Sequence, residues 1–149
     1  MSRVYDLADL ASDGADTHCR VPTIEGYAAL KLKAWVDRSS YGNVKDASDV
    51  GLVLYWCVQL IPLQERLWTK DIDLLVDAEY DAELAAVSAL GRDIRSAIGP
   101  EFSRRLSELW TAESRTRMST YLASSVPQLR SLGDADRRRA LMQAVVDRL

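Results

Sequence analysis

Apolar residues recur every three or four positions along most of the chain from residue 24 onward. This spacing places them on one face of an α-helix. It predicts helices over 24–38, 45–60, 63–68, 81–98 and 100–110, a further one to about 123, and a last one from 134 or 136 to 149. Thr23 and Asp81 stand where N-caps are expected, and Gly99-Pro100 separates two of the helices. The chain is therefore expected to be mainly α.

The first 22 residues follow a different pattern. Val4–Leu7 and Thr17–Val21 are short apolar-rich runs separated by the turn-like Ser12-Asp13-Gly14, and they are predicted to be strands. Two strands are only marginally stable without a larger sheet. We therefore expect two parts, a strand-containing segment over 1–22 and a helical region over 23–149 that packs as a single unit.

Composition narrows the class of protein. The 149 residues are 48% hydrophobic and 28% charged, which is typical of one globular domain. The N-terminal residues lack the blocks of a signal peptide and no apolar run could span a bilayer, so a cytoplasmic location is expected. His18, Cys19 and Cys57 are too few to form a zinc site.

Charge is unevenly distributed along the chain. Residues 1–90 carry 8 basic and 15 acidic side chains, a net of −7, whereas residues 91–149 carry 11 and 7, a net of +4. A basic C-terminal part favours contact with RNA or an acidic protein, but helically spaced arginines with few aromatics are more typical of a solvated surface. The run Arg137-Arg138-Arg139 is interpreted in the second way.

Three charged residues interrupt the apolar faces of the first two predicted helices. On a helical wheel Lys31 falls in the middle of the stripe that includes Leu32 and Trp35, whereas Lys33 points away. Asp46 and Asp49 lie on the apolar side of the next helix. A buried ammonium needs an anionic partner, so Lys31 is expected to meet a carboxylate or a phosphate. A lysine at the stripe's edge and first-turn aspartates that cap the helix are the alternative interpretation.

The runs that contain these residues resemble a known family. Val21–Arg38, with Leu30-Lys31-Leu32 at its centre, and Lys45-Asp46-Ala47-Ser48-Asp49-Val50 are similar to the C-terminal part of AbiEii/AbiGii-type nucleotidyltransferases. Tyr80–Ala86 and Leu90–Ile94 also resemble stretches of bacterial members. The likeness covers roughly residues 17–98.

The resemblance implies a nucleotidyltransferase fold and the transfer of a nucleotide from an NTP with Mg²⁺. Many members are toxins of toxin–antitoxin or phage-defence pairs, and some act on tRNA. Matched to the motifs, Lys31 would contact the NTP phosphates and Asp49 would complete the active-site wall. Lys45, Asp46 and Arg38 would support nucleotide binding.

The chain departs from the family at the metal site. The glycine-rich turn and the strand-borne Asp-x-Asp pair that precede the lysine motif are missing, so residues 1–22 would be the end of a catalytic sheet and the chain alone is expected to be inactive. Asp71 and Asp73 imitate the pair, but they follow the lysine motif, and Asp71 is better interpreted as a helix N-cap. The expected partners are a cognate antitoxin or the missing catalytic segment, a tRNA acceptor, and a second copy through an exposed sheet edge. The alternative function is a non-catalytic helical module that binds protein or RNA.

Overall fold

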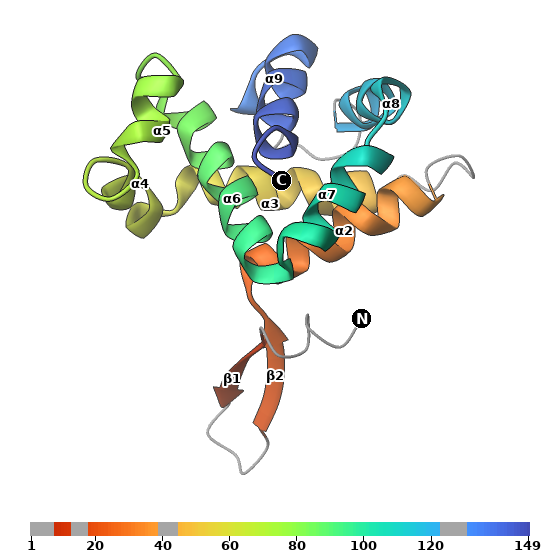
Figure 1. The fold of residues 1–149 in the computed structure, drawn as a ribbon, viewed down its shortest axis with the longest axis horizontal. Helices are drawn as coiled ribbons and strands as arrows, with labels where there is room; N and C mark the ends of the chain where they lie inside the picture. Colours follow the sequence, from red (N-terminus) through yellow and green to blue (C-terminus); the bar gives the residue numbers. More distant parts are fainter. Residues whose placement is uncertain (1–7, 13–17, 39–44, 123–130) are drawn as a thin grey trace.

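The computed structural model describes residues 8–12, 18–38, 45–122 and 131–149, and this part of the chain is mainly α-helical (Figure 1). A mainly α class is therefore confirmed. In chain order the described elements are β1 (Ala8–Ser12), β2 (His18–Pro22), α2 (Ile24–Arg38), α3 (Lys45–Gln59), α4 (Ile61–Leu67), α5 (Ile72–Asp77), α6 (Ala82–Ile98), α7 (Pro100–Leu109), α8 (Ala112–Leu122) and α9 (Ala135–Val146).

Helix α6 is the centre of the helical body. It packs against α2 and α3 on one side and against α9 on another, while the short helices α4 and α5 also contact it (Figure 1). Helices α2 and α3 pack against each other, and α8 lies against both α3 and α9. The described helices thereby enclose one hydrophobic core.

Two tryptophans anchor this core. Trp35 of α2 and Trp110 after α7 are each 1% exposed, and the indole Nε1 of Trp35 donates to the Ser114 backbone oxygen at 3.2 Å. That bond joins α2 to α8 and satisfies a polar atom that would otherwise be buried without a partner. Within the described ranges, every helix is too short or too polar to cross a lipid bilayer.

Local sequence signals explain where several helices begin. Thr23 Oγ1 accepts from the Gly26 backbone N–H at 3.4 Å, and Asp81 accepts from Glu83 and Leu84, so both predicted N-caps are confirmed. Between α6 and α7, Gly99 has a φ of 83°, a conformation that favours glycine, and Pro100 begins the next helix.

The N-terminal strands form an antiparallel pair in which Ala8 lies opposite Pro22 and Ser12 opposite His18. In Figure 1 this pair extends away from the helical body at the start of α2. The strand predicted at Val4–Leu7 lies outside the described residues. That the pair ends a larger catalytic sheet stays a prediction.

Some side chains differ from the wheel-based expectation. Trp56 and Trp68 stand at helically spaced apolar positions that favour a core or interface location, and each is 58% exposed. Trp56 lies at the edge of the apolar stripe of α3, where neighbouring helices do not cover it, and it packs edge-on against Tyr55. Ile24, at the first residue of α2, is also exposed.

The Arg137–Arg139 run was predicted to be solvated, and this is wrong for two of its members. Arg138 is buried, and Arg137 binds Asp81 at 2.6 Å and Glu83 at 2.8 Å. Since Asp81 also caps α6, Arg137 ties the start of that helix to α9. Only Arg139 keeps an exposed side chain, paired locally with Asp136.

The ion pair between Arg137 and Asp81 should contribute less to the free energy of unfolding at acidic pH than at neutral pH. The hydrogen bond from Arg137 lowers the pKa of Asp81 below its usual value, so the stabilisation is present above the unfolded-state pKa and is lost as pH falls through the folded-state value. We expect Arg137→Gln to lower the free energy of unfolding by up to about 1 kcal/mol at pH 7, and by less below about pH 4. Urea unfolding at a series of pH values measures this. Arg139→Gln is the control, and a pH-independent Arg137→Gln effect would contradict the assignment.

Candidate functional site

Lys31 and Asp49 meet between α2 and α3. Lys31 Nζ lies 2.6 Å from Asp49 Oδ2, and their side chains are 21% and 18% exposed. The pairing follows from the positions seen in the sequence, since each residue lies on the apolar face of its helix and the two faces pack together. The expected anionic partner of Lys31 is therefore a carboxylate from the next helix.

Asp46 extends this contact into a cluster of four charges. Its side chain is 3% exposed, lies 3.7 Å from Lys31 Nζ and accepts from Arg38 Nη2 at 2.8 Å. Arg38 is the last residue of α2 and its side chain is half exposed. Lys31, Arg38, Asp46 and Asp49, which we call the α2–α3 charge cluster, thus hold two positive and two negative charges.

The surroundings of Lys31 keep it charged. Its Nζ lies 5.3 Å from the centre of the Tyr27 ring, close enough for a cation–π contact. The hydrogen bond to Asp49 raises the pKa of Lys31 above its ordinary value. Lys33 points to the other side, as expected, and pairs with Asp37 on the surface. Lys31 is therefore an ammonium at neutral pH, fixed in place but still reachable by solvent.

The remaining residue of the predicted set, Lys45, is exposed at the first position of α3, next to Asp46. Four of the five predicted site residues thus lie in one connected cluster. Tyr27 was not among the predicted site residues, although its position four residues before Lys31 is the helical spacing that allows side chains to touch.

The α2–α3 charge cluster can offer a cation to an anionic ligand. A phosphate could replace Asp49 as the partner of Lys31, since the ammonium is partly exposed. A metal ion fits less well, because Asp46 and Asp49 are already engaged by cations. Over the described ranges, no three His, Cys, Asp or Glu side chains are placed to hold a metal together.

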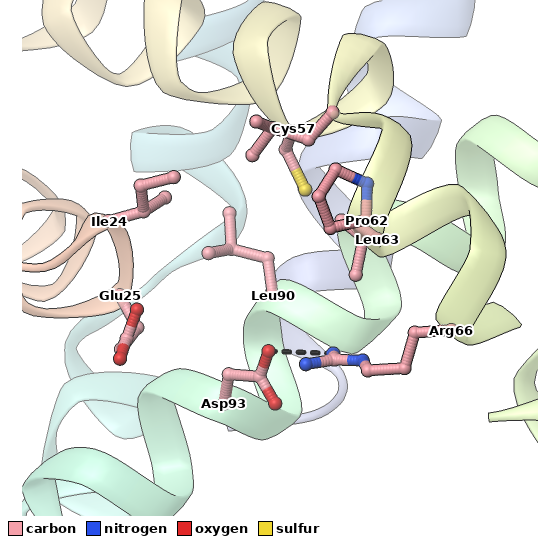
Figure 2. A pocket seen from close by; sticks show the side chains of 9 residues that line it. Ile24, Glu25, Cys57, Pro62, Leu63, Arg66, Leu90 and Asp93 are labelled. Atoms are coloured by element: carbon pink, nitrogen blue, oxygen red, sulfur yellow. Dashed lines mark hydrogen bonds and ion pairs between the residues drawn. The ribbon is translucent and has the colours of Figure 1, made fainter. Parts of the chain in front are cut away.

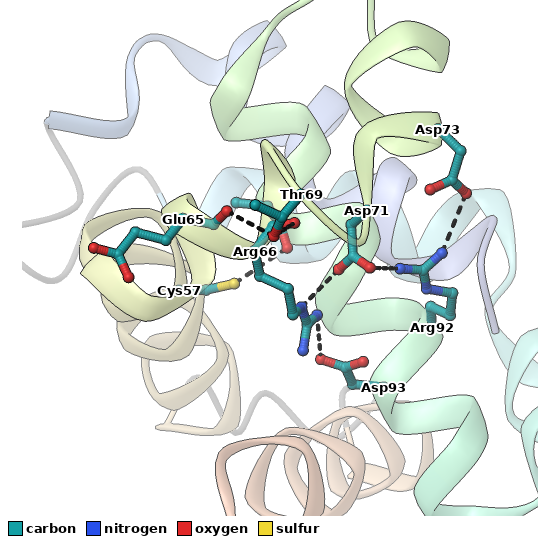
Figure 3. Close-up of polar contacts among 9 residues, drawn as sticks. Cys57, Glu65, Arg66, Thr69, Asp71, Asp73, Arg92 and Asp93 are labelled. Carbon is teal, nitrogen blue, oxygen red and sulfur yellow. Dashed lines mark hydrogen bonds and ion pairs between the residues drawn. The ribbon is translucent and has the colours of Figure 1, made fainter.

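Asp71 and Asp73, which have the spacing of the Asp-x-Asp metal motif, belong to a separate network of ion pairs (Figure 3). Asp71 is 5% exposed. Its Oδ2 lies 2.6 Å from Arg66 Nε, and its Oδ1 forms an ion pair with Arg92 Nη2. Arg66 also binds Asp93 at 2.7 Å, and Arg92 reaches Asp73 at 3.2 Å.

This arrangement joins α4, α5 and α6. Asp71 does occupy the N-cap position of α5, as expected, but its carboxylate binds the two arginines and not the helix N–H groups. This role of Asp71 was not predicted, because nothing in the local sequence shows that arginines 5 residues before and 21 residues after Asp71 converge on it.

Comparison of the chain with protein-family models, with curated proteins and with solved structures finds no significant match.

Proposed function

We propose that this chain is the helical C-terminal part of an AbiEii-type nucleotidyltransferase, a toxin of a toxin–antitoxin or phage-defence pair. In this proposal Lys31 contacts the phosphates of the NTP, Asp49 forms the wall beside it, and Arg38, Lys45 and Asp46 support the site. One observation carries the proposal: the motif lysine of α2 and the motif aspartates of α3 meet in one cluster, with Lys31 Nζ 2.6 Å from Asp49.

The geometry around Lys31 is suited to contact with the phosphates of an NTP. Nucleotide transfer depends on cations held in position against the phosphates, where negative charge must be neutralised. Lys31 is held by Asp49 and Tyr27 and stays partly exposed, so its position is set before a ligand arrives. Little side-chain ordering would then be needed when a phosphate binds.

The Mg²⁺ that the family resemblance implies does not fit the described residues. Asp46 is paired with Arg38 and Asp49 with Lys31, so neither carboxylate is available to a metal. We therefore assign no catalytic step to Mg²⁺ in this chain. The proposal is that the metal-binding carboxylates come from the missing catalytic segment, with a cognate antitoxin and a tRNA acceptor as further partners, and that this chain alone binds nucleotide without transferring it.

Nucleotide binding tests the role of Lys31. We expect Lys31→Ala to weaken NTP binding about tenfold, the size of one lost charge-assisted contact. Titration of ATP, GTP, CTP and UTP with Mg²⁺, followed by calorimetry, measures the affinity. Lys33→Ala is the matched control, because Lys33 has the same charge, lies two residues away and points elsewhere. Unchanged affinity in Lys31→Ala, or no NTP binding by the unsubstituted chain, would contradict the proposal.

A second candidate is a non-catalytic helical module that binds protein or RNA. It is favoured by the charge balance of the α2–α3 charge cluster, in which each cation already has a carboxylate partner. In that case Lys31 and Asp49 serve stability alone, and binding would take place elsewhere on the helical surface.

The two candidates differ in what replacing the Lys31–Asp49 pair should do. If the pair is only structural, each of Lys31→Met and Asp49→Leu should cost about 1–3 kcal/mol, while the double variant stays within about 1 kcal/mol of the original protein. Thermal and urea unfolding of the three variants measure this. A double variant that loses as much stability as the single variants combined counts against the structural interpretation. A stable double variant that has lost NTP binding supports the nucleotide site.

A further inference from the structure

A pocket of about 270 Å³ lies between α2, α3, α4 and α6, and it shares no lining residue with the α2–α3 charge cluster (Figure 2). Most of its lining is apolar. The apolar side chains come from all four helices and from the α3–α4 junction: Ile24, Cys57, Leu60, Pro62, Leu63 and Leu90. Figure 2 shows Leu90 projecting between Ile24 on one side and Leu63 on the other.

Cys57 counts as part of this apolar lining. Its Sγ donates to the Ala86 backbone oxygen at 3.3 Å, and burial raises the pKa of its thiol to about 12. The thiol is therefore neutral at physiological pH and unsuited to nucleophilic chemistry. The pocket offers non-covalent contacts only.

Polar groups gather along one edge of the pocket. Glu25 and Asp93 lie on the same side, below Leu90 in Figure 2, with Arg66 beside Asp93. Arg66 is already shared between Asp71 and Asp93, whereas no hydrogen bond or ion pair joins the Glu25 side chain to another described residue. The two carboxylates and one guanidinium leave this edge with a net negative charge.

The volume of the pocket restricts what can occupy it. Small-molecule sites usually measure about 300–1,000 Å³ and enclose most of the ligand. At about 270 Å³ the pocket is below that range and suits one large side chain inserted from a bigger partner. Peptide recognition commonly uses such an anchor residue in an apolar pocket, with charges at the rim that set specificity.

We propose that this pocket binds a peptide segment of a partner protein in which a bulky apolar residue stands next to an arginine or lysine. The apolar side chain fills the space beside Leu90 and Cys57, and the neighbouring cation pairs with Glu25 at the rim. The proposal is independent of nucleotide binding, because pocket and charge cluster are built from different residues.

Three short peptides test it: acetyl-Phe-Arg-amide, acetyl-Phe-Glu-amide and acetyl-Gly-Arg-amide, each added to the ¹⁵N-labelled chain up to about 5 mM, a range that detects weak binding. We expect the Phe-Arg peptide to shift the amide signals of Glu25, Cys57 and Leu90. It should bind at least about threefold more tightly than either of the others, since it alone combines apolar burial with the ion pair.

Two variants separate the parts of the interaction. Glu25→Gln should reduce the preference for the Phe-Arg peptide over the Phe-Glu peptide about threefold. Ile24→Ser should lower the affinity for both Phe-containing peptides. Glu113→Gln, which changes another first-turn glutamate in α8, is the control. Thermal unfolding verifies that each variant is folded. Equal affinity for Phe-Arg and Phe-Glu, signal shifts outside the pocket, or no shift at the highest concentration would overturn the proposal.

Discussion

Asp71→Asn is expected to lower the free energy of unfolding by about 2–3 kcal/mol. The Asp71 side chain is 7% exposed, and its carboxylate pairs with two arginines at once, one on each oxygen. An amide of the same shape loses the negative charge and leaves Arg66 and Arg92 with a weaker partner in a partly buried position. Removing one member of a buried ion pair typically costs 3–5 kcal/mol, and the partial exposure of both arginines reduces that figure. Urea unfolding at pH 7 measures the change.

Asp73→Asn is the matched control for this prediction. Asp73 lies two residues away and binds the same Arg92, but its side chain is 60% exposed. We expect it to change stability by less than about 0.5 kcal/mol, as exposed ion pairs generally do. Equal effects of the two substitutions would mean that burial does not distinguish them, which would contradict the network described for α4, α5 and α6.

The second large effect is expected at Gly91 in α6. A β-carbon built there would collide with the Val145 backbone oxygen of α9 and would lie 3.1 Å from the Val145 carbonyl carbon. An alanine at most helix positions stabilises by about 1 kcal/mol relative to glycine. At this position the clash with backbone should force α6 and α9 apart, so Gly91→Ala is expected to cost about 1–3 kcal/mol.

The comparison for Gly91→Ala is Ser96→Ala, an exposed position on the same helix. It should leave the free energy of unfolding unchanged or raise it by a few tenths of a kcal/mol. Thermal unfolding of both variants tests the pair of expectations. A stabilised Gly91→Ala protein would show that α6 and α9 do not pack as closely as described.

The helices were predictable from the sequence because their signals are local. The spacing of apolar residues and the caps at Thr23 and Asp81 act within a few residues of one another, so α2 and α6 begin where expected. The partner of Lys31 could also be narrowed to a carboxylate, since an ammonium within an apolar stripe needs a counter-charge.

The contacts that the sequence did not reveal join residues far apart in the chain. Arg137 reaches Asp81 across 56 positions, and no pattern around the arginine run shows that a helix N-cap lies beside it. The exposure of Trp56 depends on which neighbouring helices cover the edge of the α3 stripe. Helical spacing identifies an apolar face but does not tell how much of its width is covered.

The most direct measurement for the central claim follows the Lys31 ammonium itself. Nitrogen-detected NMR of lysine Nζ groups in the ¹⁵N-lysine-labelled chain, with Lys31→Ala used to identify the signal, shows whether this group changes partner when Mg-ATP, Mg-GTP, Mg-CTP or Mg-UTP is added. We predict that at least one nucleotide shifts the Lys31 signal while that of Lys33, paired with Asp37 on the opposite side, stays in place. A Lys31 signal that stays unchanged with all four nucleotides would mean that the ammonium remains with Asp49, and the phosphate-binding role would be wrong.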